Sequence, residues 1–374
     1  MFLANSSSGN SSTSTLATKS DSCSSIGDET TLKSVHTTAY CIVLLLSLFG
    51  NSMIILVVYR NQRMWTTSNY LIVNMAASDL LLPFFAVPRM IVEVLVGKER
   101  WLISGTGGLV LCKLAYFLQD VSTAVSVQSL LAITAERFYA VKFPLKAAAM
   151  KSKIRYVIPI TWFTAMALHA PYLQVFQLHM THGDLYCVQR WTMSSKSKFI
   201  YFVLILSLVF GFPLITIIVL YAGIVYKLFR QKLPPGARNS ITQKQQNRRA
   251  RQNKNVLRMA VTVVVIFFLC FSPLVILALL LITQSIGKCK AETFRIIAKF
   301  LAQSNCAMNA FVYYAFNSQF RRGFISNLRT IFCLGCKGED RIVINVRYSI
   351  SSQRISLLSE KRKRTWSGRQ PSET

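Results

Sequence analysis

Residues 41–58 of the chain read CIVLLLSLFGNSMIILVV, which is eighteen consecutive residues without a charged side chain. An apolar run of this length is typical of an α-helix that crosses the roughly 30 Å hydrocarbon core of a membrane. Strands of a β-barrel would be about half as long and would alternate polar and apolar residues. Together with this run, the sequence contains seven apolar runs, centred near Leu48, Leu81, Val125, Ile160, Leu208, Ile266 and Met308. The sequence therefore predicts an all-α membrane protein, a bundle of seven transmembrane helices.

The composition also indicates a membrane protein. Hydrophobic residues make up 52% of the 374 residues and charged residues only 15%, against roughly 25% charged residues in soluble domains. The chain has 43 Lys and Arg residues and 14 Asp and Glu residues, a balance that in a soluble protein would suggest nucleic-acid binding. Here the basic residues gather in short segments between the apolar runs, so we interpret them as topology signals and expect no nucleic-acid partner.

Basic residues dominate alternate loops, which predicts the orientation of the chain. They lie at Arg60 and Arg63, between Lys142 and Arg155, and between Lys227 and Arg258. By the positive-inside rule these loops are cytoplasmic, so we expect the N-terminus outside the plasma membrane and the C-terminus inside. The two Asn-x-Ser sequons, at Asn5 and Asn10, fall in the outer tail as expected glycosylation sites.

Four segments are expected along the chain. They are an extracellular tail at 1–35, the seven-helix domain at 36–316, an amphipathic helix at 317–332 and a disordered cytoplasmic tail at 333–374. The amphipathic helix is predicted because apolar residues repeat every four positions, at Phe316, Phe320, Phe324 and Leu328. We expect this helix to lie on the inner membrane surface.

Asp79 lies within the second apolar run, where a carboxylate costs about 2.5 to 3.5 kcal/mol on insertion scales. It needs partners from other helices, and polar groups are available near mid-membrane at Asn51, Ser126, Asn305 and Asn309. Oxygen atoms around one carboxylate could hold a hard monovalent cation. A hydrogen-bond network with water and without an ion is the alternative. No other metal or cofactor is expected, because His179 and His182 are more often solvated than bound to zinc.

The third apolar run carries a mostly polar stripe on one helical face. Its members recur at spacings of three, four or seven residues, at Cys112, Tyr116, Gln119, Thr123, Ser126, Leu130 and Arg137. A polar stripe facing the interior of a bundle predicts a water-accessible cavity. At its inner end, Glu136 and Arg137 place an acid beside a guanidinium group at the cytoplasmic boundary.

Taken in order, these features resemble the rhodopsin-like class of G-protein-coupled receptors. The resemblance covers about residues 40–324 and rests on motifs in every helix. The motifs are Gly50-Asn51; Asn74-Met-Ala-Ala-Ser-Asp79-Leu80; Cys112 with Glu136-Arg137-Phe138; Trp162 with Pro171; Pro213 with Tyr221; Phe271-Ser272-Pro273; and Asn309-Ala310-Phe311-Val312-Tyr313 followed by Phe320. The resemblance implies a receptor that binds an extracellular ligand and activates heterotrimeric G proteins.

The resemblance also implies roles for particular residues. Cys112 and Cys187 would form a disulfide that ties the second outer loop to the third helix. On activation, Arg137 would leave Glu136, with Tyr221 and Tyr313 closing behind it. Bends at Pro213 and Pro273 would give the bundle two arrangements. A sodium site would consist of Asp79, Ser126, Asn305 and Asn309.

Three residues depart from the family pattern. Phe271 stands where the family usually has tryptophan, so the ligand-sensing ring is smaller. Ala310 replaces the usual proline, so any kink in the seventh helix must come from packing or water. Cys306 stands where serine is common in the ion site, which weakens the sodium prediction.

The ligand class follows from residues that are missing. Amine receptors of this class carry an aspartate where this chain has Gln119, and opsins carry a lysine where it has Gln303. The remaining pattern resembles neuropeptide receptors of the neuropeptide Y, RFamide and tachykinin groups, on Gln119, Pro88-Arg89 and Tyr186-Cys187-Val188. A peptide ligand is therefore expected.

The expected ligand site has mixed charge. Its residues are Arg89, Glu93, Tyr116, Gln119, Asp120, Thr123, Phe271, Arg295, Lys299 and Gln303. Glu93 or Asp120 can take a basic side chain of a peptide. A small carboxylate ligand is an alternative, with Arg89, Arg295 and Lys299 as its clamp, and an amine ligand is disfavoured.

Four further cysteines lie in or beside segments that are expected outside the hydrocarbon core of the membrane. Cys23 and Cys289 are expected to form a second outer disulfide, and Cys333 and Cys336 to carry palmitate. A receptor kinase and arrestin are expected to act on hydroxyl groups of the cytoplasmic tail, at Ser349, Ser351, Ser352, Ser356, Thr365 and Ser367.

A membrane transporter is the alternative from another class of protein. Transporters usually show internal repeats and broken helices at mid-membrane, and the sequence shows neither convincingly. An enzyme is not expected, because the chain has no Gly-x-Ser-x-Gly or His-Glu-x-x-His motif and no second deep carboxylate to pair with Asp79.

Overall fold

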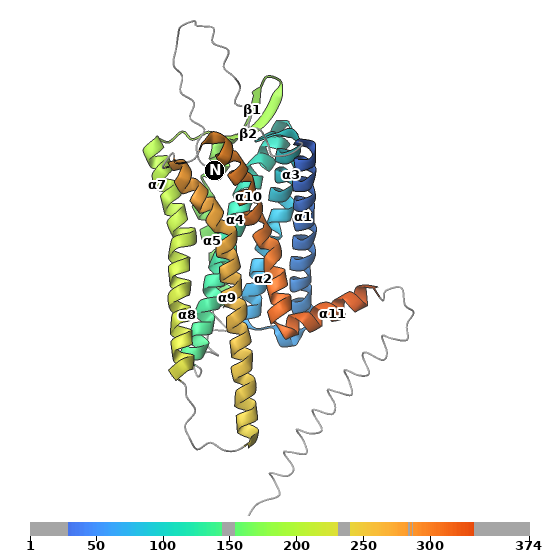
Figure 1. The fold of residues 1–374 in the computed structure, drawn as a ribbon, viewed down its shortest axis with the longest axis vertical. Helices are drawn as coiled ribbons and strands as arrows, with labels where there is room; N and C mark the ends of the chain where they lie inside the picture. Colours follow the sequence, from blue (N-terminus) through green and yellow to red (C-terminus); the bar gives the residue numbers. More distant parts are fainter. Residues whose placement is uncertain (1–28, 144–153, 231–239, 283–284, 286, 333–374) are drawn as a thin grey trace, which may run out of the picture. The chain divides into compact units, whose positions relative to one another are not determined.

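The computed structural model describes residues 29–143, 154–230, 240–282, 285 and 287–332. Helices predominate in it (Figure 1). In chain order the elements are α1 Glu29–Arg60, η1 Gln62–Met64, α2 Thr67–Asp79, η2 Leu82–Ala86, α3 Val87–Val96, α4 Gly105–Lys142, α5 Ile154–His169, α6 Tyr172–Val175, β1 Phe176–Thr181, β2 Asp184–Gln189, α7 Ser195–Ile205, η4 Leu206–Gly211, α8 Phe212–Arg230, α9 Ser240–Ile282, α10 Lys288–Phe316 and α11 Ser318–Phe332.

Several predicted sites lie outside the described residues. They are Asn5, Asn10, Cys23, Cys333, Cys336 and the six hydroxyl groups of the C-terminal tail, together with the side chain of Cys289. The glycosylation, palmitoylation, second-disulfide and tail-phosphorylation predictions therefore stay predictions.

The helices group into the seven spans that the apolar runs predict. Those spans are α1, α2 to α3, α4, α5 to α6, α7 to α8, α9 and α10. Within the described ranges, four segments are individually long and apolar enough to cross a membrane: Thr30–Arg60, Gly105–Lys142, Ser195–Lys227 and Val261–Leu280. The second span is divided by η2, and α10 carries Arg295 and Lys299, so their apolar stretches are shorter.

Two π-helical turns interrupt the spans, and each lies at a proline. Pro83 is the second residue of η2, and Pro213 follows two residues after η4. Proline lacks the N–H group that would continue the α-helical ladder, so a wider turn accommodates the gap. Pro273, in contrast, lies inside the continuous helix α9.

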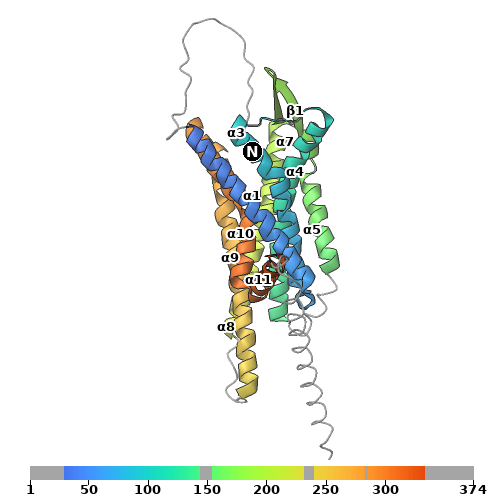
Figure 2. The same ribbon diagram turned by 90° about the vertical axis from the view of Figure 1, so that its right-hand side faces the viewer.

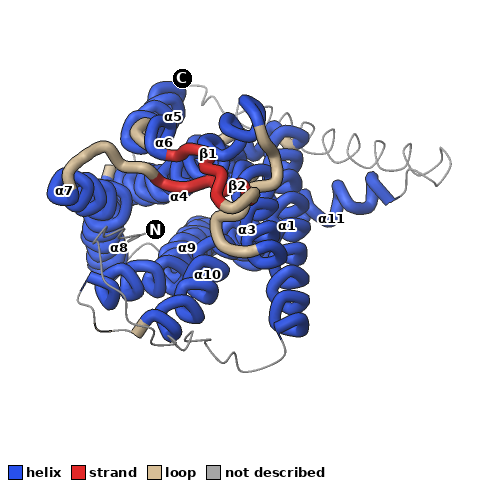
Figure 3. The backbone as a smooth tube through the Cα atoms, turned by 90° about the horizontal axis from the view of Figure 1, so that it is seen from above, coloured by secondary structure: helices blue, strands red, loops and turns tan. Residues whose placement is uncertain are grey.

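The hairpin of β1 and β2 lies across one end of the bundle, hereafter the hairpin end (Figures 1 and 3). The strands pair antiparallel, with Thr181 opposite Asp184. The two residues between them, His182 and Gly183, have φ of 51° and 84°, and positive φ at both positions is what a tight two-residue hairpin turn requires.

A disulfide joins this hairpin to the bundle. Cys187 of β2 is bonded to Cys112 of α4, with Cα atoms 5.9 Å apart, which confirms the predicted pairing. The segment before α4 adds hydrogen bonds, because the Trp101 N–H group donates to the Leu185 carbonyl group (2.8 Å) and the Cys187 N–H group to the Glu99 carbonyl group (2.9 Å). The hairpin is thus held against the bundle by covalent and backbone bonds.

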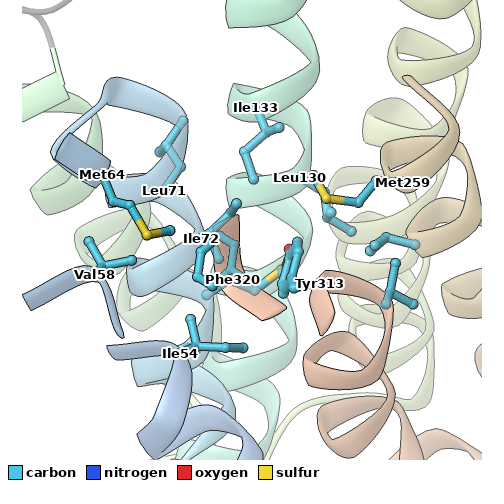
Figure 4. Close-up of a cluster of buried hydrophobic side chains, with 14 of the residues drawn as sticks. Ile54, Val58, Met64, Leu71, Ile72, Leu130, Ile133, Met259, Tyr313 and Phe320 are labelled. Carbon is cyan, nitrogen blue, oxygen red and sulfur yellow. Dashed lines mark hydrogen bonds between the residues drawn. The ribbon is translucent and has the colours of Figure 1, made fainter. Parts of the chain in front are cut away.

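The largest apolar cluster of the described residues, part of which is drawn in Figure 4, lies in the half of the bundle away from the hairpin. It draws side chains from most of the spans, including Ile54 of α1, Leu71 of α2, Leu130 of α4 and Met259 of α9. Helix α1 packs along α10 here (Figure 2). The approach is close because Gly50 has no side chain: a Cβ atom there would lie 2.5 Å from that of Ala310.

The first half of α11 packs on the ends of α1 and α10. Phe320 is buried with its ring centre 5.9 Å from that of Tyr313. The Phe324 ring lies edge-on to Phe49 (5.6 Å) and to Tyr314 (5.3 Å). The chain from residue 325 onward forms a separate unit, in which α11 continues to Phe332. A helix after the seventh span is therefore confirmed, and its place on the membrane surface stays a prediction.

Candidate ligand and signalling sites

Arg89 of α3 is the centre of a polar cluster at the hairpin end. Its side chain is buried, and its Nη2 atom donates to Gln119 Oε1 of α4 at 2.7 Å. Its Nη1 atom lies 3.5 Å from Glu93 Oε2, one turn along α3. The guanidinium carbon lies 4.0 Å from the ring centre of Tyr116, close enough for a cation–π contact. Three predicted ligand residues therefore surround a fourth.

Glu93 extends this cluster to α10. The Lys299 Nζ atom donates to Glu93 Oε1 at 2.7 Å, so one carboxylate is paired with two cations. One α-helical turn farther out, Arg295 pairs with Glu292 at 2.9 Å, and Lys98 pairs with the same carboxylate at 3.3 Å. Ion pairs thus join α10 to α3, through Glu93, and to the segment that follows α3, through Lys98.

Gln303 lies one turn from Lys299 on α10 and is 6% exposed. Its Oε1 atom is buried and has no hydrogen-bond partner in the part of the chain that the structure describes. A buried carbonyl oxygen without a donor is costly, so this atom is a free acceptor for a donor supplied by water or a ligand.

Asp120 lies on the other side of Gln119 from Arg89. The Gln119 Nε2 atom donates to Asp120 Oδ1 at 3.2 Å, and the Tyr172 hydroxyl group also hydrogen-bonds the carboxylate. The remaining predicted residues contact other groups: the Thr123 hydroxyl group donates to the Gln119 carbonyl oxygen at 3.2 Å. Phe271 stacks on Phe267 with ring centres 4.5 Å apart. Sequence reasoning did not identify Tyr172, because nothing in a single helix pattern links it to Asp120.

A second polar network surrounds Asp79, which is 1% exposed. Ser126 Oγ donates to Asp79 Oδ1 at 2.7 Å, and Asn309 Nδ2 donates to Oδ2 at 2.8 Å. The predicted partner Asn51 contacts another group instead, since its Nδ2 atom donates to the Cys306 carbonyl oxygen at 3.0 Å. The network thus connects α2 with α4 and α10 through the carboxylate, and α1 with α10 through a backbone oxygen.

The residues around Asp79 fit a hard monovalent cation. Asn305, which belongs to the predicted sodium site, has a buried Oδ1 atom that lacks a donor among the described residues. The Asp79 carboxylate, the Ser126 hydroxyl group and the amide oxygens of Asn305 and Asn309 are the kinds of oxygen ligand that such an ion prefers. Elsewhere, the described residues contain no group of three or more His, Cys, Asp or Glu side chains that could hold a metal ion. His179 instead lies 2.9 Å from the Arg190 guanidinium group.

At the end of the bundle opposite the hairpin, Arg137 is held by two residues. Its Nε atom lies 3.3 Å from Glu136 Oε2, and its Nη2 atom donates to Ser68 Oγ of α2 at 2.7 Å. Ser68 Oγ in turn donates to Glu136 Oε2 at 2.7 Å. The three side chains form a closed triangle between α2 and α4. No motif in the sequence identified Ser68, because a single serine at a helix start resembles an ordinary capping residue.

The two predicted tyrosines make contacts that are separate from this triangle. The Thr134 hydroxyl group donates to the Tyr221 hydroxyl group at 3.4 Å, which links α4 to α8. The Tyr313 hydroxyl group is directed at Met75 Sδ at 4.0 Å. Both tyrosines are buried. Arg137 therefore lies on the α2 side of α4 while Tyr221 and Tyr313 have other partners.

Asn74 connects three helices near the middle of the bundle. Its Nδ2 atom donates to Ser129 Oγ of α4 at 2.9 Å, and to Thr161 Oγ1 of α5 at 3.3 Å. The Trp162 indole N–H group donates to Asn74 Oδ1 at 2.8 Å. Both Asn74 and Trp162 belong to the motifs recognised in the sequence, and their contacts fix α2 against α4 and α5.

Comparison with known families decides between the classes of membrane protein. Residues 50–313 match the family model described as the 7 transmembrane receptor (rhodopsin family). The chain belongs to this family. The resemblance inferred from the motifs is thereby confirmed, as is the seven-helix bundle. This rhodopsin-family receptor is a multi-pass protein of the plasma membrane, and its family consists of receptors and not of enzymes or transporters.

Known relatives of this receptor are named for peptides. It is 30% identical to a QRFP-like peptide receptor of Branchiostoma floridae over 79% of this chain and 78% of that protein. It is 30% identical to the RYamide receptor of Drosophila melanogaster over 80% of this chain and 66% of that protein. It is 29% identical to neuropeptide FF receptor 1 of Homo sapiens over 79% and 70% of the two chains.

Proposed function

We propose that this chain is a neuropeptide receptor, which binds an amidated peptide at the hairpin end and activates heterotrimeric G proteins at the opposite end. The observation that carries the proposal is the similarity, over about four-fifths of the chain, to receptors named for peptides. The names RYamide and RF-amide denote an arginine followed by tyrosine or phenylalanine and a C-terminal amide.

The chemistry of the hairpin end supports a peptide more than a small charged ligand. A carboxylate ligand would need a free cation, but Arg89, Arg295 and Lys299 are each paired with an acid. A peptide amide instead needs an acceptor for its N–H groups, and Gln303 Oε1 is a buried acceptor without a partner in the described residues. The proposed ligand site comprises Arg89, Glu93, Tyr116, Gln119, Asp120, Thr123, Phe271, Lys299 and Gln303.

We infer that the hairpin end is extracellular and the end with Arg137 is cytoplasmic. The clustering of Lys and Arg in the loops at that end supports this orientation, as do the sequons Asn5 and Asn10 in the N-terminal tail. In this orientation, the N-terminal tail is extracellular and glycosylated, and the C-terminal tail is cytoplasmic.

Signalling in this proposal is a transition between two arrangements of the bundle. In the arrangement described here, Arg137 is bound by Glu136 and Ser68. Ligand binding favours the other arrangement, in which Arg137 is released toward a G protein and Tyr221 and Tyr313 move behind it. The helix segments around η4 and Pro273 supply the change in shape, because η4 is a π-helical turn and Pro273 lacks one N–H group inside the continuous helix α9.

The remaining partners belong to the same proposal. A sodium ion binds at Asp79, Ser126, Asn305 and Asn309 and stabilises the resting arrangement. Helix α11 lies on the inner leaflet of the lipid bilayer, with palmitate at Cys333 and Cys336. A receptor kinase and arrestin act on the C-terminal tail, and Cys23 pairs with Cys289 across the outer face.

The test is a signalling assay in cultured cells. We expect calcium or cyclic-AMP responses to amidated neuropeptides and not to amines or small carboxylates. Arg137→Ala, expressed at the same surface level, should lose the response. A response confined to a carboxylate would overturn the peptide assignment. A peptide response that Arg137→Ala retains in full would overturn the proposed coupling mechanism.

A further inference from the structure

We propose that Asp120, flanked by Tyr172 and Tyr201, is the residue that binds a cationic side chain of the ligand, an arginine guanidinium group above all. This inference rests on the proposed function and selects one acid of the ligand site over the others. It follows from the ion pairs at the hairpin end and from the aromatic rings around the carboxylate.

Glu93 is already neutralised within the receptor. Lys299 contacts one carboxylate oxygen at 2.7 Å and Arg89 approaches the other at 3.5 Å. The Glu93 and Lys299 side chains are 18% and 25% exposed, so a ligand cation would have to displace an internal partner from a largely buried pair. Displacing Lys299 leaves its buried charge without a partner, and this costs more free energy than the ligand cation gains unless that cation is better placed beside Glu93.

At the hairpin end, the other acids whose side chains the structure describes are paired or exposed. Asp184 pairs with Arg100, and Glu292 pairs with Arg295 and Lys98. Glu99 is exposed on the segment between α3 and α4. None of these carboxylates is both partly buried and without a cation.

Asp120 differs from all of them. It is partly buried in α4, and no Lys, Arg or His side chain of the described residues forms an ion pair with it. Gln119 separates it from Arg89, because its side-chain Oε1 atom accepts from Arg89 at 2.7 Å and its Nε2 atom donates to Asp120 at 3.2 Å. The carboxylate therefore keeps a charge that a ligand can neutralise.

Two tyrosines, Tyr172 and Tyr201, interact with Asp120. The Tyr172 hydroxyl group hydrogen-bonds the carboxylate, and Tyr201 lies within electrostatic range of it. The two rings are 6.4 Å apart, and the Trp191 ring lies 5.4 Å from Tyr201. The rim of this ring cluster already attracts one cation, because Lys198 Nζ lies 5.8 Å from the Trp191 ring centre.

An acid beside aromatic residues matches the chemistry of a guanidinium group. Its planar fork donates two parallel hydrogen bonds to a carboxylate, and its faces stack on aromatic rings. A lysine ammonium group satisfies the carboxylate but stacks less well. The site therefore favours arginine over lysine at the matching position of the ligand.

The experiment uses four amidated peptides of eight residues, ending in Arg-Phe-amide or Arg-Tyr-amide, or with citrulline in place of the arginine. Citrulline keeps the shape of arginine without its charge. Wild-type receptor should respond to an arginine peptide at a concentration at least about 30-fold lower than to its citrulline partner, the factor expected for one half of a desolvated charge pair.

Receptor variants identify which acid binds the charged arginine side chain of the peptide. In the Asp120→Asn variant, the potency of the arginine peptide should fall about 30-fold. The difference in potency between the arginine and citrulline peptides, called the citrulline penalty, should vanish. Asp120→Glu should retain the penalty, as should the matched control Glu93→Gln. Asp120→Ser is made in parallel as a second neutral variant in case the asparagine variant does not reach the cell surface.

The outcomes separate this inference from the proposed function. Equal potency of arginine and citrulline peptides in wild-type receptor would overturn the inference and leave the peptide receptor standing. The citrulline penalty could instead persist in the neutral Asp120 variants and vanish in Glu93→Gln. That result would assign binding of the ligand cation to Glu93 and would also overturn the inference. A surface-expressed wild type that responds to none of the four peptides would overturn both.

Discussion

Replacing Ser68 with alanine should raise the ligand-free activity of the receptor. Ser68 Oγ accepts a hydrogen bond from Arg137 and donates one to Glu136, both at 2.7 Å. The substitution removes both bonds and leaves the direct contact of 3.3 Å between Arg137 and Glu136. Arg137 would then be held in the resting arrangement by one interaction in place of two.

The expected magnitude follows from the type and exposure of these bonds. A hydrogen bond to a charged group contributes about 1.5 to 3 kcal/mol. Water can replace part of this, because the Arg137 and Glu136 side chains are 34% and 17% exposed, so we take a net loss of about 1.5 kcal/mol for the two bonds. A loss of that size shifts the equilibrium between the two arrangements about tenfold.

The assay is second-messenger output without ligand, divided by the number of receptors at the cell surface. Ser68→Ala should show several-fold to about tenfold higher basal output, and Ser68→Thr, which keeps the hydroxyl group, should remain near wild type. Ser34→Ala is the matched control, because among the described residues the Ser34 hydroxyl group bonds only the Thr30 carbonyl oxygen of its own helix. Unchanged basal output in Ser68→Ala would refute the idea that Ser68 restrains Arg137.

Three further predictions concern other parts of the bundle. Agonist affinity in wild-type receptor should fall when sodium replaces choline in the buffer, and Asp79→Asn should abolish that dependence; a sodium effect that survives in the variant would argue against the site. Cys112→Ser should lower the thermal midpoint and the surface level of the receptor, because the disulfide closes a sequence separation of 75 residues, worth about 4 kcal/mol on chain entropy; an unaltered midpoint would contradict this. Glu93→Gln and Lys299→Met should show a coupling of about 1 to 3 kcal/mol in a double-mutant cycle of stability, since the two side chains are 2.7 Å apart; additive effects would show that the pair contributes nothing.

The transmembrane spans and the polar face of α4 could be predicted, because each of these features is encoded within a single helix. Run length identifies a membrane-crossing helix, and a period of 3.6 residues identifies the face of α4 that bears Gln119 and Ser126. The burial of Asp79 with Ser126 and Asn309 also followed, since a carboxylate in hydrocarbon needs partners and few polar groups lie at its depth.

Contacts that depend on the distance between helices could not be predicted. Asn51 was one of the polar groups available near Asp79, but no sequence pattern indicated that its amide nitrogen would donate to the Cys306 carbonyl oxygen, a contact made where α1 approaches α10 closely at Gly50. Ser68 meets Arg137 only because α2 and α4 pack together at that level. Such contacts depend on how helices are placed relative to each other, which the periodicity of a single helix does not encode.

The central claim, a peptide receptor that activates G proteins, is tested most directly with purified receptor in lipid nanodiscs and purified heterotrimeric G protein. The measurement is the rate of guanine-nucleotide exchange with and without an amidated peptide. The account predicts that a peptide ending in Arg-Phe-amide or Arg-Tyr-amide accelerates exchange by wild-type receptor and not by Arg137→Ala. Exchange that no amidated peptide accelerates, from receptor shown to be folded, would contradict it.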